Sequence, residues 1–420
     1  MKIIDVDVVV IGGGPAGLAA AIEAKKQGTK KVMIIERDTS LGGILQQCIH
    51  DGFGLHRFGK QLSGCEYADN YIEELNTYDI EVAYDTIVVE ILKDKTVYAM
   101  NKTDGIIEIH PKAIILAMGC RERTRSQAFI WGTRPSGVLT AGTVQRYINI
   151  EGYLPGKKAV ILGSGDIGLI MARRMTLEGI EVLGVYELMD SPGGLSRNIA
   201  QCLVDYDIKM HLSTTVIKTH GNSKLTGVTV AKVDSNRNVI KGTEEYIECD
   251  LLVLAVGLIP ENELSNQLEL DIDPLTRGPI VDDQFMTSME GVFAAGNVVT
   301  VFDLVDYVSL TGEIAGAGAA KYLKNELDLK QEYLPIKSGE NVSFVVPQKI
   351  RLNNLSEELP LYFRVRNKQE KTEVGVFELE NKIYKKRHRV VLPPEMIVEK
   401  ISTKLIGEIN TPLVVSVKEV

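Results

Sequence analysis

The sequence predicts an α/β protein in which one parallel-sheet domain is inserted into another and a β-rich domain follows. Two observations carry this prediction. A strand, glycine turn, helix and strand begin near residue 6 and recur from residue 160, and a buried strand ending in glycine follows each copy. Beyond residue 330 the pattern changes to alternating apolar and polar residues, which is typical of strands. The order of elements in each repeated unit is Rossmann-like.

The first unit contains a predicted dinucleotide site. An apolar run, residues 6–11, ends in a glycine-rich turn, and a second apolar run, residues 32–35, ends on Glu36 and Arg37. Such a turn lets a pyrophosphate approach bare backbone at the positive end of the following helix, and Glu36 can accept hydrogen bonds from a ribose. The predicted site residues are Gly12, Gly14, Pro15, Ala16, Gly17, Glu36 and Arg37.

The second unit repeats this order and spacing. Its turn follows residues 160–162, a helical stretch ends at Gly179, and residues 182–186 lead to Glu187. Two copies in matched context favour two dinucleotide sites over the alternative of glycine-rich turns in an ordinary core. The predicted second site comprises Gly163, Gly165, Asp166, Ile167, Gly168 and Glu187.

Further glycines mark places where backbone passes close to a ligand. Two apolar strands, residues 113–119 and 251–257, end in Gly119 and Gly257. Gly42 and Gly43 follow the first unit, and a late apolar strand ends in Gly296 and Asn297. The small residues at 315–320 suit close packing of a helix predicted from about Leu304 to Leu323. Asp303 and Asp306 are expected to supply its N-cap and first-turn charge.

Domain boundaries and shorter elements follow from these landmarks. We expect residues 1–124 and 258–330 to form the first domain, 125–257 the inserted domain and 331–420 the β-rich domain. A helix is predicted at 66–78, and residues 51–65 are predicted to be a loop. Candidate strands are 80–83, 86–92, 96–101, 105–109, 342–346, 361–365 and 374–377, and the basic run 382–389 is expected to be a solvated strand or turn.

Composition limits the classes of function. The 420 residues are 45% hydrophobic and 25% charged, which is typical of a soluble globular protein, and the net charge is −9. This charge argues against nucleic acid and anionic membranes as partners. With no membrane span or signal peptide apparent, a cytoplasmic location is predicted. Five cysteines without a Cys-x-x-Cys predict neither a disulfide scaffold nor a metal site.

Together the motifs resemble the two-dinucleotide-binding-domain flavoproteins, the pyridine nucleotide-disulphide reductase-like superfamily that includes glutathione reductase and thioredoxin reductase. The resemblance covers about residues 1–330. It implies FAD at the first turn, with Gly42, Gly43, Gly119, Gly296 and Asn297, and NAD(P)H at the second, with Gly257. Asn297 departs from the usual Asp, although an amide can still bond a hydroxyl. Glu187 favours NAD over NADP because a carboxylate repels a 2′-phosphate, while Arg197 leaves NADP open.

A closer resemblance rests on residues 42–54, 119–125, 193–198 and 303–306. These segments are similar to the alpha-type subunits of dye-linked proline dehydrogenase, opine oxidase and hydrogen cyanide synthase, and to flavoproteins associated with glycerol-3-phosphate dehydrogenase. The resemblance implies a partner, either a second flavoprotein or a dehydrogenase subunit, and assembly into an oligomer.

The predicted activity is hydride transfer between NAD(P)H and FAD, with electrons exchanged with that partner. A dithiol relay is disfavoured because only Cys48 lies where a cysteine pair would follow Gly43. Catalytic candidates are Cys48, through a sulfenic acid, and His50, which we expect in one loop with His56 and Arg57 near the flavin. The alternatives are a packing cysteine and a histidine bonded to backbone. Rival functions are a stand-alone NADH oxidase or peroxidase that uses Cys48, and a subunit that holds nucleotides without turnover.

Overall fold

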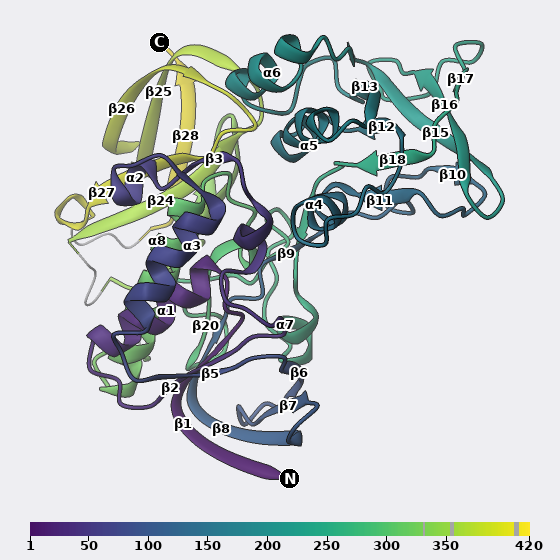
Figure 1. Cartoon of the computed structure of the whole chain (residues 1–420). Helices are drawn as coiled ribbons and strands as arrows, with labels where there is room; N and C mark the ends of the chain where they lie inside the picture. The colour runs from purple at the N-terminus through teal and green to yellow at the C-terminus, as the bar shows by residue number, and fades with distance from the viewer. Residues whose placement is uncertain (331, 353–356, 407–410) are drawn as a thin grey trace. The chain divides into compact units, whose positions relative to one another are not determined.

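The computed structural model describes residues 1–330, 332–352, 357–406 and 411–420 and is drawn in Figure 1. The chain divides into two compact units. The first comprises Met1–Gln46, Asp51–Cys120 and Pro260–Val420, and the second comprises Gln47–His50 and Arg121–Ile259. The chain passes from the first unit into the main part of the second at β9 (Cys120–Glu122) and returns at β19 (Leu258–Pro260), and both strands are short. The predicted fold class, two Rossmann-like domains with one inserted and a β-rich C-terminal region, is confirmed.

The first unit is built on a seven-stranded sheet in the order β5-β2-β1-β8-β7-β6, with β20 also beside β8. Strands β5, β2, β1, β8 and β20 are parallel, whereas β7 and β6 extend the sheet antiparallel. All four residues of β2 are buried, as expected for a parallel strand covered on both faces. The strands are β1 (Lys2–Ile11), β2 (Val32–Ile35), β5 (Ile80–Ala83), β6 (Ile87–Ile91), β7 (Val97–Asn101), β8 (Gly105–Leu116) and β20 (Val292–Ala294).

Strand β8 is longer than predicted. The sequence was divided into strands 105–109 and 113–119, and this division is wrong because one strand continues through Pro111. On the side opposite β1, β8 pairs with β7 as far as Ile109 and with β20 from Ile114. Pro111 falls between these two neighbours, so its missing N–H removes no bond to either.

Helix α1 (Pro15–Lys26) and helix α8 (Val305–Leu323) lie side by side in the first unit (Figure 1). Their backbones meet at glycines of α8. A Cβ added to Gly312 would lie 2.2 Å from the carbonyl oxygen of Ala16, and one on Gly316 would lie 2.3 Å from that of Ala20. The predicted close packing of small residues on this helix is confirmed at Gly316, and Gly312 extends it by one turn.

The segment that follows Gly42 and Gly43 contains more regular secondary structure than predicted. The expected loop 51–65 contains β3 (Asp51–Phe53), the one-turn helix α2 (Leu55–Phe58) and β4 (Leu62–Ser63). Helix α3 (Gly64–Leu75) begins two residues earlier than predicted, because Ser63 and Glu66 form a reciprocal capping box. The remaining short helices of this unit are η1 (Gly43–Gln47), α7 (Glu263–Gln267) and η3 (Gly296–Val298).

The second unit contains a five-stranded parallel sheet in the order β11-β18-β12-β13-β14 and a four-stranded sheet in the order β10-β15-β16-β17. The strands of the parallel sheet are β11 (Val138–Thr140), β12 (Lys158–Leu162), β13 (Glu181–Tyr186), β14 (Met210–His211) and β18 (Leu251–Leu254). Those of the other sheet are β10 (Trp131–Gly132), β15 (Thr214–Gly221), β16 (Leu225–Lys232) and β17 (Glu245–Ile247). The helices are α4 (Ala141–Asn149), α5 (Asp166–Leu177), α6 (Ser196–Cys202) and η2 (Val204–Tyr206).

The C-terminal region of the first unit consists of two sheets, β23-β21-β28-β25-β26 and β22-β24-β27, around a core of their own. Val346, Tyr362 and Met396 join the core of the parallel sheet instead, so the β-rich region packs against the rest of its unit. The basic run 382–389 lies on β26, as a strand. The elements are β21 (Leu334–Ser338), β22 (Val342–Val346), β23 (Lys349–Ile350), β24 (Glu358–Val365), β25 (Gln369–Glu378), β26 (Asn381–Val391), β27 (Ile397–Ser402), η4 (Thr403–Leu405) and β28 (Leu413–Glu419).

Candidate functional site

The first glycine turn connects β1 to α1, and each glycine has a separate structural reason. Gly12 has a φ of +105°, and a Cβ there would lie 2.5 Å from the carbonyl oxygen of Ala117. A Cβ at Gly17 would lie 1.8 Å from the oxygen of Gly12, so the helix can approach the turn only without a side chain. At Gly14, by contrast, an added Cβ meets no atom within 4 Å. The first turn of α1 carries no acidic residue, so this open space at its positive end suits a pyrophosphate.

Glu36 closes the turn from the end of β2. Its Oε2 accepts a hydrogen bond from the Gly13 N–H at 2.7 Å, and its Oε1 accepts one from the Asp38 N–H at 2.8 Å. The side chain is 6% exposed. Each carboxylate oxygen can accept a second bond, so Glu36 both stabilises the turn and retains acceptors for a ribose hydroxyl. Arg37, the next residue, is exposed.

Several other predicted residues lie beside this turn. A Cβ at Gly43 would come within 3.2 Å of the Gly14 Cα, and one at Gly296 within 2.8 Å of the Ala16 Cβ. Gly42, with a φ of +101°, packs against Gln46 and Ala68 of the chain itself. Gly119 has a φ of +72° and open space beside it. The first unit therefore brings Gly43 and Gly296 onto the glycine turn, which fits the extended shape of FAD.

Asn297 is held by its own chain. Its Oδ1 accepts a hydrogen bond from the Phe302 N–H at 3.0 Å, and its Nδ2 lies 3.6 Å from the Cys120 Sγ. The amide therefore organises the loop before α8, and a ribityl contact from the same side chain stays a prediction. The N-cap role predicted for Asp303 is wrong, because Leu304 is the N-cap and Asp303 accepts from the Met396 N–H.

Asp306, Arg57 and Thr311 make contacts near the first glycine turn that the sequence analysis did not predict. Asp306 carries charge in the first turn of α8, as predicted, and also accepts from the Arg57 N–H at 3.2 Å. The Arg57 guanidinium forms an ion pair with Glu313, which lies about two helical turns after Asp306 on α8. Thr311 accepts a hydrogen bond from the Gly296 N–H at 2.9 Å. No local motif marks Thr311, because its partner lies on another element.

The second glycine turn has the same construction in the second unit. A Cβ at Gly163 would lie 2.2 Å from the Ala255 oxygen, one at Gly168 would lie 2.5 Å from the Gly163 oxygen, and Gly165 faces open space. Glu187, 8% exposed, accepts from the Ser164 N–H at 2.9 Å and from the Met189 N–H at 2.9 Å. The two turns therefore share one geometry, and the donors and spaces of the second fit a nicotinamide nucleotide as those of the first fit FAD.

Ser164 belongs to the hydrogen-bond network of this turn, although it is not among the residues predicted from the sequence. Its hydroxyl donates to the Glu187 Oε2 at 2.6 Å and accepts from the Gly193 N–H at 2.8 Å. A polar residue at the variable position of a Gly-x-Gly turn was the available signal.

Two other predicted residues lie in the second unit. Gly257, with a φ of +101°, lies next to the Arg123 side chain, and Ile167 follows Asp166 in the first turn of α5.

His50 does not share a loop with His56 and Arg57, so that prediction is wrong. Cys48 and His50 belong to the short segment grouped with the second unit, whereas His56 and Arg57 lie in α2 of the first. Cys48 is 8% exposed, and its Sγ lies 3.9 Å from the amide oxygen of Gln145 on α4. Roles for Cys48 and His50 in the reaction stay predictions.

The cysteines are all unbridged. Burial raises the pKa of Cys65 and Cys202, and raises that of Cys249 to about 12. A high pKa disfavours the thiolate, the nucleophilic form, so these three thiols are poor redox groups.

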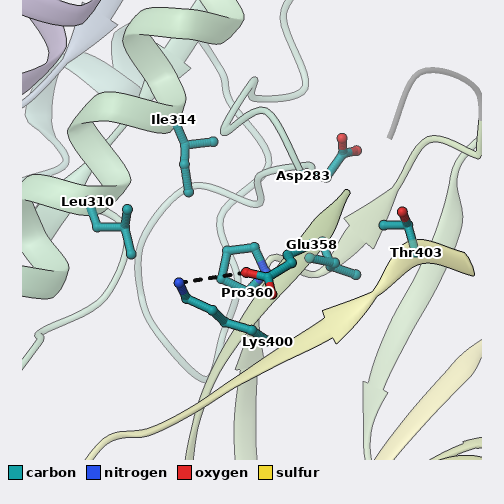
Figure 2. Close-up of a pocket in the computed structure, with 8 residues that line it drawn as sticks. Asp283, Leu310, Ile314, Glu358, Pro360, Lys400 and Thr403 are labelled. Atoms are coloured by element: carbon teal, nitrogen blue, oxygen red, sulfur yellow. Dashed lines mark ion pairs between the residues drawn. The ribbon is translucent and has the colours of Figure 1, made fainter. Parts of the chain in front are cut away.

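A separate cavity of about 200 Å³ lies between α8 and strands β24 and β27 (Figure 2). Leu310 and Ile314 point toward it from α8, and Lys400 pairs with Glu358 at 3.7 Å. The described residues that line this cavity include none of the site residues predicted from the sequence. It is therefore not part of either glycine-turn site.

These turns, carboxylates and topology define a flavoprotein with two dinucleotide sites. The chain belongs to the pyridine nucleotide-disulphide oxidoreductase family, whose model matches residues 6–330. Members of this family are FAD-dependent oxidoreductases that use NAD(P)H, which agrees with the enzyme class and cofactors predicted from the sequence. Among its described residues, no helix is both long and apolar enough to cross a membrane.

The relatives agree with the closer resemblance. Hydrogen cyanide synthase subunit HcnB of Pseudomonas protegens is 28% identical over 63% of this chain and 59% of that protein. Sarcosine oxidase subunit alpha of Corynebacterium sp. is 27% identical over 80% of this chain. The chain spans only 34% of that second relative. The structure of L-proline dehydrogenase from P. horikoshii shares the fold, with a TM-score of 0.54 and 21% identity, over 77% of this chain and 56% of that one.

Proposed function

We propose that the protein transfers a hydride between NAD(H) and FAD and exchanges the electrons with a partner redox protein. The observation that carries this proposal is the pair of matched glycine turns, each closed by a buried carboxylate, in a chain without a cysteine pair. When bound, FAD supplies the hydride chemistry. The protein holds the two nucleotides on their turns, orients their riboses and leaves the electron acceptor to a partner.

The coenzyme preference follows from Glu187. Its carboxylate lies at the end of β13, where the ribose of a dinucleotide bound at the turn is held. Both carboxylate oxygens already accept backbone N–H groups, so the charge is fixed in place. A 2′-phosphate would bring a second negative charge to this position. NADH is therefore the expected coenzyme.

Two features support a protein partner. Both relatives described above are named as subunits. On the second unit, Phe129 and Trp131 are 77% and 73% exposed. The Arg125 guanidinium donates to the carbonyl oxygens of Ile130 and Gly132, each at 3.0 Å, and so holds this loop in shape. A loop held by its own hydrogen bonds that exposes Trp and Phe has the aromatic composition typical of protein interfaces.

The experiment is an anaerobic titration of the purified protein with NADH and, separately, with NADPH, followed by the flavin absorbance. The proposal expects about one equivalent of NADH to bleach the flavin. Trp131→Ala should bleach equally, because its loop contributes no residue of either turn. Bound flavin that neither nucleotide bleaches would reject the proposal and favour a subunit that holds nucleotides without turnover.

A further inference from the structure

A six-residue segment, Gly193–Asn198, packs on the second glycine turn, and we call it the strap. The Gly193 N–H donates to the Ser164 hydroxyl at 2.8 Å. A Cβ at Gly194 would come within 2.9 Å of both the Ser164 carbonyl oxygen and the Asp166 Oδ1. The strap therefore touches the turn that the coenzyme must also reach.

Asp166 holds the other end of the strap. Its Oδ1 accepts from the Leu195 N–H at 2.9 Å and from the Asn198 side-chain amide at 2.6 Å. Both donors are neutral, and among the described residues no lysine or arginine forms an ion pair with this carboxylate. No cationic side chain among the described residues therefore offsets this carboxylate in the first turn of α5.

The position of this charge distinguishes the two turns. The first turn of α1 has no acidic residue, whereas α5 begins with Asp166. A carboxylate in a first helical turn offsets the positive end of the helix, and that positive end is what attracts a pyrophosphate. The same carboxylate repels the two pyrophosphate charges directly.

We propose that Asp166 is a positioning residue that latches the strap onto the second glycine turn and, through its charge, weakens the binding of the coenzyme pyrophosphate. This inference rests on the proposed function, in which NAD(H) binds the second turn. The two consequences differ in origin. The latch needs an acceptor oxygen at Asp166, whereas the weakened affinity needs its charge.

Substitutions at Asp166 and Asn198 separate the latch from the effect of charge on affinity. Asp166→Asn keeps an acceptor oxygen and removes the charge, Asp166→Ala removes both, and Asn198→Ala removes one latch bond and keeps the charge. Asp190→Asn is the matched control, since Asp190 is exposed and precedes the strap. All variants are made in the full-length flavoprotein, and each is checked for FAD content and circular dichroism before use.

Two measurements are made on each protein. Hydrogen exchange of the amides of Gly193 and Leu195, without coenzyme, reports the latch directly because these amides are its donors. Calorimetric titration with NAD⁺ reports the affinity. We expect Asp166→Asn to bind NAD⁺ about two- to fivefold more tightly, with protection retained. Asp166→Ala and Asn198→Ala should lose protection at Leu195, and the control should change neither quantity.

Each half can fail separately. Unchanged protection at Leu195 in both Asp166→Ala and Asn198→Ala would overturn the latch. Equal NAD⁺ affinity in Asp166→Asn and the wild type would overturn the electrostatic half. If neither the wild type nor any variant bound NAD⁺, the proposed function and the affinity claim would both be rejected. Lost protection at Leu195 in Asn198→Ala would still support the latch.

Discussion

The packing of α8 on α1 can be tested by replacing Gly316 with alanine. The new Cβ would lie 2.3 Å from the Ala20 carbonyl oxygen, and a backbone atom cannot rotate away. The helices would have to separate by about 1 Å to reach ordinary contact. Overpacking of this kind costs about 1–3 kcal/mol, and alanine returns about 1 kcal/mol of helix propensity. We therefore expect a net loss of up to about 2 kcal/mol.

The same displacement should weaken FAD binding. Helix α1 begins at the first glycine turn, and Gly296 lies against Ala16 at the start of that helix. Moving α1 away from α8 would therefore separate the turn from Gly296, two parts of the same site. The ratio of FAD to protein after purification should fall with the stability.

Urea unfolding followed by circular dichroism, with flavin fluorescence recorded in parallel, measures both effects. Ala317→Gly, at a half-buried position on the same helix, is the control, because it loses about 1 kcal/mol of propensity without a clash. If Gly316→Ala unfolded at higher urea than the wild type and kept its FAD, close packing at this glycine would be refuted.

Three further predictions concern coenzyme choice, the thiol and pH. Glu187→Gln should shift the ratio of NADP⁺ to NAD⁺ affinity toward NADP⁺ by at least about fivefold, because one repulsive charge near 4 Å is worth about 1 kcal/mol even in water; an unchanged ratio in calorimetric titrations would contradict the ribose assignment. Cys48→Ser should leave NADH-dependent flavin bleaching and peroxide turnover unchanged, since the thiol is buried; loss of peroxide turnover would support the peroxidase instead. Burial, with the neighbouring Asp283, raises the pKa of Asp282 from 3.8 to about 6. The folded protein therefore keeps a proton that the unfolded chain loses, and this stabilisation is present below about pH 4 and lost as the pH rises through about 6. Asp282→Asn should flatten this part of the stability profile in urea unfolding between about pH 4 and pH 7, and an equally steep profile would refute the shift.

The glycine turns could be read from the sequence because their requirements are local. Gly12 and Gly163 need a positive φ, and Gly17 and Gly168 need close approach to a carbonyl oxygen only five residues away. The strand before each turn and the carboxylate after it follow at fixed spacing. The helix predicted from about Leu304 is likewise within one residue of the observed start of α8.

Other expectations failed where the chain's own long-range contacts decided the outcome. The sequence predicts a break at residues 110–112, between strands 105–109 and 113–119. The strand instead continues, because on the side opposite β1 Pro111 falls between the neighbours β7 and β20. Asp303 was read as a helix cap, but its carboxylate accepts from Met396, ninety-three residues away in sequence. A cap and a break are local interpretations, and a distant partner can override both.

The sequence by itself determined the two glycine turns, their carboxylates and the order of the domains, because glycine positions and apolar patterns set backbone geometry over a few residues. Only the tertiary structure decided that Ser164 joins Glu187 to Gly193 and that Asp166 holds Asn198. The partners in these bonds lie 23 to 32 residues apart. Which side chains meet over such separations depends on how the elements pack, and no local pattern records it.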